Sequence, residues 1–361
     1  MAPRRVLFFD RRPWRPLRFV VVAVLLACER GRPPAPAAPG PALAGASDPA
    51  GLIASGWELL ERAGDRDSGA ALDRFVRARA VLPDAPLAVA GEGIARAMGG
   101  DAAGAEPLLR RALAPDGCAA LVPRNRLALT HFALGNLLFD GGRTAEAEPE
   151  YRAAVADAAT GLGRASALAQ IARIELDGNR LDAADATLAD ALAACPENGQ
   201  AHFVRATLMK RRGDADAAAR ELRIHELLRA IEESSARRPV DVERLLAARR
   251  DLVAAWPGSE AVRLELIRAL VAAGRYGDAE LEAAALLQAK GPSAPLAWLL
   301  ARAQAGRGDL AGATKARALM LRLDPRSPPA LDEEIVAEWR RGGVRFTEAA
   351  AARLLAEWRR R

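Results

Sequence analysis

Side chains that carry catalytic or metal chemistry are few in this sequence and are not clustered. The 361 residues include three histidines and three cysteines, and no Cys-x-x-Cys pair occurs. His131, His202 and His225 stand apart, without the His-Glu-x-x-His spacing of a zinc site, and no Gly-x-Ser-x-Gly or phosphate-binding glycine loop is present. A catalytic nucleophile needs a base within hydrogen-bond reach. The sequence therefore predicts no catalytic site, no metal and no cofactor, and the histidines are interpreted as packing or surface residues.

The N-terminal segment has the composition of an export signal. Residues 1–18 hold six arginines and one acid, and an apolar run over residues 19–27 follows directly. This order is typical of a secretory signal peptide. The apolar run is too short for a stable membrane span, which takes about 20 apolar residues. We therefore predict a signal peptide over residues 1–27.

The end of that run, Leu25-Leu26-Ala27-Cys28, resembles the bacterial lipobox. The resemblance implies that Cys28 is lipidated, becomes the first mature residue and anchors the protein in the cell envelope, facing the periplasm, on either the inner or the outer membrane. Two alternatives remain: an ordinary signal in which Cys28 is only a small apolar residue, and a cytoplasmic protein on an uncleaved signal anchor. Residues 28–51 are rich in Pro, Ala and Gly and are predicted to form a tether.

The distribution of charge argues against a nucleic-acid partner. The chain has 52 basic and 46 acidic residues, a formal net charge of +6. Removal of residues 1–27 takes away six arginines and one aspartate and leaves 46 basic and 45 acidic residues. A protein that binds DNA or RNA keeps a basic stripe on its folded part. We therefore predict no nucleic-acid partner.

A repeated pattern runs through the chain from residue 52. A glycine precedes an alanine by five residues at Gly100/Ala105, Gly142/Ala147, Gly213/Ala218, Gly274/Ala279 and Gly308/Ala313. With Ala71 and Ala184 included, successive alanines are 34, 42, 37, 34, 61 and 34 residues apart. The unit is therefore 34 residues. We interpret it as two helices, the first ended by glycine and the second by Pro or Gly, with one degenerate repeat near 219–258.

This period, together with Leu134-Gly135, Tyr151 and Ala154, resembles the tetratricopeptide repeat. The resemblance implies an all-α fold, an α-solenoid of about seven to eight helix-turn-helix repeats over residues 52–325. Each helix pair hides its apolar face by stacking on its neighbours. Arg317 and Met320 depart from the pattern in the last repeat, where an aromatic residue and an alanine are expected.

Residues 326–361 are predicted to form C-terminal capping helices. Two short helices are expected, over 331–341 and 347–360, and both carry the string Ala-Glu-Trp-Arg-Arg. Solenoids need a cap with a polar outer face. The alternative is a second binding or membrane-facing element built on Trp339, Trp358 and the basic residues 359–361.

The resemblance also implies a binding surface. In this family the first helices line a concave groove, where the fifth and ninth places of each unit meet an extended peptide. Aromatic side chains there can stack on apolar groups, while guanidinium groups bind carboxylates. Asn136 resembles the asparagine with which the family grips a peptide backbone. The alternative is that the arginines cover surface and the aromatic residues pack between helices. The candidate residues are Phe132, Asn136, Arg173, Phe203, Lys210, Arg268, Trp298 and Arg302.

The sequence thus predicts a non-catalytic protein-protein interaction scaffold in the bacterial cell envelope. Its partners would be a protein or an extended peptide in the groove and the membrane through the lipid anchor. The alternative function is an accessory subunit that delivers a protein substrate to a separate envelope enzyme. Cys118 and Cys195 fall two repeats apart, about 20 Å in stacked helices, which disfavours a disulfide between them, although the eight-residue insertion that begins near Cys118 leaves this alternative open.

Overall fold

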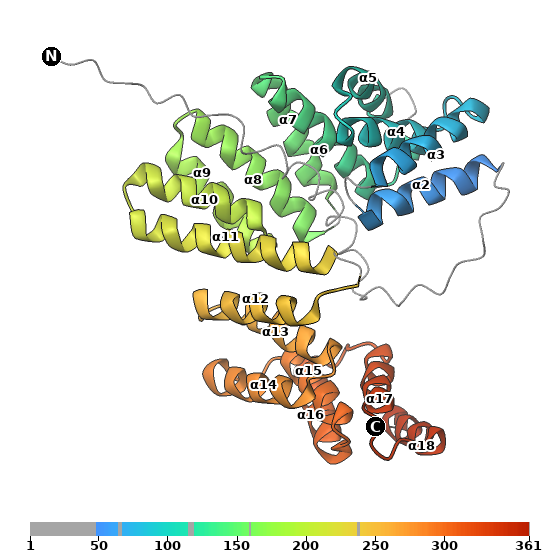
Figure 1. Ribbon diagram of the computed structural model, residues 1–361, viewed down its shortest axis with the longest axis vertical. Helices are drawn as coiled ribbons and strands as arrows, with labels where there is room; N and C mark the ends of the chain where they lie inside the picture. The colour runs from blue at the N-terminus through green and yellow to red at the C-terminus, as the bar shows by residue number, and fades with distance from the viewer. Residues whose placement is uncertain (1–47, 64–66, 115–118, 159, 237–238, 361) are drawn as a thin grey trace. The chain divides into compact units, whose positions relative to one another are not determined.

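The computed structural model describes residues 48–63, 67–114, 119–158, 160–236 and 239–360. In these ranges the chain forms seventeen α-helices and one short 3-10 helix and contains no β-strand (Figure 1), which confirms the predicted all-α class. None of the helices in these ranges is long and apolar enough to cross a bilayer. The predicted signal peptide, Cys28, the tether up to residue 47 and Cys118 lie outside the described residues.

The chain divides into two compact units, with the boundary between Ala218 and Ala219. The first unit consists of consecutive helices that pack on one another in pairs (Figure 1). Its helices are α2 (Pro49–Ala63), α3 (Ser68–Val81), α4 (Pro86–Met98), α5 (Ala102–Ala112), the 3-10 helix η4 (Ala119–Leu121), α6 (Arg124–Asp140), α7 (Thr144–Asp157), α8 (Gly161–Asp177), α9 (Leu181–Ala194) and α10 (Gly199–Arg212). Helix α2 begins at Pro49, so the last residues of the predicted tether are helical.

The turns inside the pairs explain why glycine recurs in the sequence. All five of the repeated glycines have a positive φ, between +72° and +86°, in the left-handed region that glycine enters without steric cost. They are Gly100, Gly142, Gly213, Gly274 and Gly308. Asn179 stands five residues before Ala184, at the place that the glycine takes in the other repeats. It adopts φ +57°, because asparagine tolerates the same conformation. The predicted ends of the first helices are therefore confirmed.

The repeated alanines lie where two helices come closest. Six of the seven are fully buried: Ala71, Ala105, Ala147, Ala184, Ala279 and Ala313. Glycine serves the same purpose on the first helix, because a Cβ on Gly135 would lie 2.8 Å from the ring of Tyr151. Ala218 is the exception. It is only half-buried, and it lies at the boundary between the units.

The second unit contains most of α11 (Ala215–Ala236) and the helices that follow it. These are α12 (Val242–Ala255), α13 (Glu260–Ala272), α14 (Tyr276–Lys290), α15 (Ala294–Gly306), α16 (Leu310–Leu323), α17 (Ala330–Gly342) and α18 (Glu348–Arg360). Side chains of α11, α12 and α13 form one apolar cluster around Leu228 and Leu252. The irregular 61-residue spacing from Ala218 to Ala279 therefore contains most of the long helix α11 and two ordinary helices, α12 and α13.

The two C-terminal helices pack into the unit through their tryptophans. Trp339 and Trp358 are buried with Ala301, Ala305 and other side chains of α15 and α16. The Nε1 of Trp339 donates to the backbone oxygen of Val344 at 2.8 Å. Both rings are buried, so neither Trp339 nor Trp358 is exposed for the alternative role of a membrane-facing surface.

Candidate protein-docking surfaces

Phe132, the first residue of the predicted row, is a core side chain. It is 3% exposed and its ring lies 5.8 Å from that of Tyr151 on the paired helix α7. This is the arrangement that the alternative interpretation expects, with aromatic residues packed between helices. Phe132 is therefore not available to a partner on the surface of α6.

Asn136 lies one turn further along α6 and is half-buried. Its Oδ1 accepts hydrogen bonds from the Tyr151 hydroxyl at 2.8 Å and from Gln170 Nε2 at 3.2 Å. The Nδ2 amide makes no hydrogen bond with a described residue, so its two donors can serve a ligand. Tyr151 and Gln170 thereby orient the amide, which the sequence could not show.

Arg173 on α8 is half-buried, with its guanidinium 4.5 Å from the ring centroid of Phe139 on α6. Phe139 was not among the sequence candidates, although it follows Asn136 by three places and hence lies on the same face of the helix. Phe203 on α10 is half-buried, and Lys210, two turns on, is exposed. We call Asn136, Phe139, Arg173, Phe203 and Lys210 the first-unit row.

The three candidates of the second unit differ in how far their side chains are exposed. Arg268 on α13 is exposed and forms an ion pair with Glu265 of the same helix. Trp298 on α15 is half-buried, and the guanidinium of Arg302 lies 4.7 Å from its ring centroid. Trp298 also contributes to the apolar cluster that holds α17. Of these three residues, only Arg268 is exposed.

Arg302 already has a carboxylate partner inside the chain. It is 8% exposed, and its Nε and Nη2 donate to Oε1 of Glu338 on α17. Glu338 is itself fully buried and also accepts from the Tyr276 hydroxyl at 3.2 Å. Arg302 therefore meets a carboxylate through two nitrogens and one oxygen, and an internal helix supplies that carboxylate.

Arg317 is a buried charge that was not among the candidates. Its Nε and Nη2 donate to the two carboxylate oxygens of Asp332 on α17, at 2.6 and 2.7 Å, and its guanidinium lies 4.9 Å from the Trp358 ring centroid. The sequence contained a signal for it, because Arg317 stands where the repeat expects an aromatic residue. That departure marks the place where the C-terminal helices dock.

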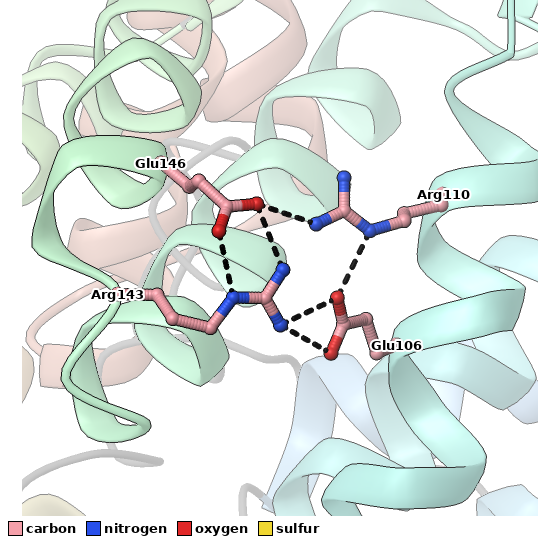
Figure 2. Close-up of polar contacts among 4 residues, drawn as sticks. All are labelled: Glu106, Arg110, Arg143 and Glu146. Carbon is pink, nitrogen blue, oxygen red and sulfur yellow. Dashed lines mark hydrogen bonds and ion pairs between the residues drawn. The ribbon is translucent and has the colours of Figure 1, made fainter.

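A closed ring in which acid and base alternate is formed by two charged residues of α5, one of α7 and Arg143 just before α7 (Figure 2). Arg110 Nε donates to Glu106 at 2.9 Å and its Nη2 to Glu146 at 3.0 Å. Arg143, the residue before α7, donates to Glu106 at 2.9 Å and to Glu146 at 2.8 Å. Each charge has two partners of opposite sign, so the ring clamps adjacent repeats together and does not offer a binding site.

Similar clamps join other successive repeats. In each of them, an arginine beside the turn of one helix pair forms an ion pair with an acid on the second helix of the preceding pair. The pairs are Arg180–Glu148 (3.6 Å), Arg212–Asp182 (2.9 Å), Arg275–Glu243 (3.1 Å) and Arg307–Glu280. Exposed ion pairs each stabilise a protein little. Their regular recurrence nevertheless accounts for many of the chain's arginines as structural residues.

We expect the ring of Figure 2 to make stability depend on acid and salt. Hydrogen bonds from Arg143 and Arg110 lower the pKa of Glu146 to about 2, and those from Arg110 and Arg143 lower the pKa of Glu106. A lowered carboxyl pKa gives stability that is present above the unfolded pKa and is lost as the pH falls through the folded one. Arg143→Ala should therefore lower the thermal midpoint slightly at pH 7 and low salt. The difference should shrink at about pH 2 and in about 1 M salt, and a difference that persists there would contradict the electrostatic origin.

The histidines act in packing, and the described residues hold no cluster suited to a metal. His131 Nδ1 lies 2.7 Å from Glu150 Oε2 across the α6/α7 pair, and His202 Nε2 lies 2.8 Å from the backbone oxygen of Pro196. His225 is buried in α11. Within the described ranges no group of three or more His, Cys, Asp or Glu residues could hold a metal ion.

The consecutive helix pairs, left-handed turns and buried alanines define an α-solenoid of tetratricopeptide-like repeats. No protein-family model matches this chain, and the comparison with curated proteins found no match.

Solved structures with a similar arrangement of helices include three from different organisms. Pseudomonas aeruginosa pilF is 18% identical, with a TM-score of 0.30, over 72% of this chain and 96% of that one. A tetratricopeptide repeat protein from Parabacteroides merdae is 15% identical, with a TM-score of 0.32, over 70% and 98%. The human IFIT1 dimer with PPP-AAAA is 18% identical, with a TM-score of 0.39, over 76% and 73%. At these scores the likeness carries no conclusion about ligands.

Proposed function

We propose that this protein is a non-catalytic scaffold that docks an extended segment of another protein on the first-unit row and is held at a bacterial membrane by lipidated Cys28. The observation that carries the docking proposal is the stack of Arg173 on Phe139, 4.5 Å from guanidinium to ring centroid, beside an oriented Asn136 amide. Together with exposed Lys210, the row presents donors and positive charge next to aromatic surface.

This combination suits an extended peptide that carries acidic side chains. The Asn136 amide can donate to a backbone carbonyl, Phe139 and Phe203 can contact apolar side chains, and Arg173 and Lys210 can pair with carboxylates. A nucleic acid is a poorer fit, because arginines of the first unit such as Arg143, Arg180 and Arg212 are engaged in the clamps between repeats. The proposed partner is therefore a protein.

Charge reversal of the row tests the docking surface. A photo-crosslinking residue at Thr207, half-buried between Phe203 and Lys210 on α10, would trap the partner in living cells. Arg173→Glu combined with Lys210→Glu should lower the yield of the adduct at least about tenfold, since loss of charged contacts worth about 1.4 kcal/mol changes affinity by that factor. Helical content should stay unchanged.

Arg152→Glu is the matched control, because Arg152 is an exposed arginine on the second helix α7 and, among the described residues, forms an ion pair only with Glu148 of the same helix. It should leave the adduct unchanged. An adduct that survives the reversal of Arg173 and Lys210 would show that the partner docks elsewhere. Identification of an enzyme in the adduct would favour the accessory-subunit alternative.

Lipid labelling tests the membrane anchor separately. The wild-type protein should incorporate a labelled fatty acid and lose residues 1–27, whereas Cys28→Ala should do neither, because the thiol is the site of attachment. Cys195→Ala is the control and should be labelled like the wild type. An unlabelled wild-type protein of full length would contradict the lipoprotein proposal.

A further inference from the structure

Helix α17 packs differently from most first helices of the repeats. Most of these pack mainly on the second helix that precedes them, as α8 does on α7 and α15 on α14, whereas α10 packs about equally on α8 and α9. Helix α17 instead packs mainly on α15, the first helix of the last pair, and much less on α16. Its Glu338 pairs with Arg302, and its Trp339 lies in the same apolar cluster as Trp298.

Helix α17 is held by both apolar contacts and ion pairs. One stripe of the helix is buried, formed by Asp332, Ile335, Val336, Glu338 and Trp339. Its apolar members join the cluster of α15 and α16 side chains, and its two acids bind Arg317 and Arg302. Both arginines also stack on tryptophans, Trp358 and Trp298 respectively.

The backbones of α17 and α15 come into close contact at Gly342 and Gly306. A Cβ on Gly342 would lie 1.8 Å from the backbone oxygen of Gly306, so the carboxyl ends of α17 and α15 can meet only through glycine. We call Tyr276, Trp298, Arg302, Gly306 and Arg317 the α17-binding face. It combines an apolar strip, two buried positive charges and a glycine contact.

We propose that the α17-binding face is a receptor for an acidic amphipathic helix and that α17 is its resident occupant. A partner helix with the same pattern, an aspartate, two aliphatic residues, a glutamate and a tryptophan on one stripe, must then compete with α17. The inference is independent of the first-unit row, which lies on other helices and is proposed to take an extended segment.

Covalent attachment gives α17 a large advantage over such a competitor. Residues 324–329 connect it directly to α16, and a short linker holds a ligand at an effective concentration of about millimolar or more. A free helix at micromolar concentration should therefore bind only when the internal contact is weakened. Glu338 is the residue to change, because it is fully buried and meets Arg302, Tyr276 and Arg341.

The test uses the full chain and a fluorescent synthetic peptide of residues 327–346 as the probe, titrated by anisotropy. The wild-type chain should bind the peptide with half-saturation no lower than about 1 mM. Glu338→Lys in the chain should raise the affinity for the wild-type peptide at least about tenfold. Glu333→Lys is the matched control, because Glu333 is an exposed acid of the same helix, and it should bind like the wild type. A peptide that itself carries Glu338→Lys should bind none of the chains.

Equal affinities of the Glu338→Lys and Glu333→Lys chains for the peptide would overturn the proposal. Should Glu338→Lys lose helical content, Glu338→Gln replaces it in the same titration, with an expected gain of at least about threefold. Hydrogen exchange of the wild-type chain gives a second measurement that needs no variant. The amides of α17 should exchange together and faster than those of α13 and α15. Exchange of α17 only at the rate of the whole second unit would also overturn it.

Discussion

Glu338→Leu is expected to lower the free energy of unfolding of the second unit by about 3 to 5 kcal/mol, the cost of leaving a buried charge unpaired. Arg302 is 8% exposed and donates to Glu338 through two nitrogens. The other acid near it, Glu334, lies 3.5 Å away and is about half exposed, so it cannot replace a fully buried partner. Four of the five described tryptophans belong to this unit, so denaturation followed by tryptophan fluorescence measures the loss.

A double variant separates the effect of the two charges on stability from the effect of side-chain volume. Arg302→Met with Glu338→Leu removes both charges and keeps comparable volume, and it should be more stable than Glu338→Leu alone. Glu333→Leu, at an exposed place on the same helix, should change the free energy by no more than about 0.5 kcal/mol. A Glu338→Leu protein as stable as the Glu333→Leu protein would mean that the internal contact contributes little.

The second large effect is a loss of stability between pH 5 and pH 8 that originates at Glu232 on α11. Burial raises the pKa of this carboxyl to about 7, because it disfavours the ionised form more than nearby Arg229 favours it. A carboxyl whose pKa is raised in the folded state stabilises the protein below its unfolded pKa of 4.5, and this is lost as the pH rises through about 7. The shift corresponds to a loss of at most about 3 kcal/mol.

Glu232→Gln should remove this part of the pH dependence. Glutamine keeps the shape without a charge, so the variant should be more stable than the wild type at pH 8 and similar to it at pH 5. Chemical denaturation at both pH values gives the comparison. Glu226→Gln, at an exposed acid of the same helix whose charge does not act on the Glu232 pKa, should leave the profile unchanged. A wild-type stability that is flat over this range would contradict the assignment to Glu232.

Local features of the fold could be predicted because they depend on residues close in sequence. The left-handed φ of Gly142 and Gly308 follows from what a tight turn between two helices requires, and the burial of Ala147 and Ala313 follows from the close approach five residues later. The helices expected over 331–341 and 347–360 form as α17 and α18. None of these conclusions required knowledge of which helices meet across the chain.

The exposure and the partners of the candidate binding residues could not be predicted from the sequence in the same way. Their places in the repeat predicted that Arg302 meets a carboxylate of a bound peptide, whereas in the structure it meets Glu338 of the same chain, 36 residues further on. Phe132 was buried by Tyr151, while Phe139, which no family position suggested, became the surface on which Arg173 stacks. Exposure of a side chain depends on its neighbours in space, and the repeat pattern specifies only neighbours on the same pair of helices.

By itself, the sequence determined the unit of this protein: two helices, a glycine turn and an alanine contact, because turn geometry and helix spacing act over a few residues. Tertiary structure alone decided which side chains on the first helices are exposed and which are buried. The physical reason is that a charged or aromatic residue on a helix face is available only if no distant segment covers it. In the second unit, α17 covers that face through Arg302 and Arg317.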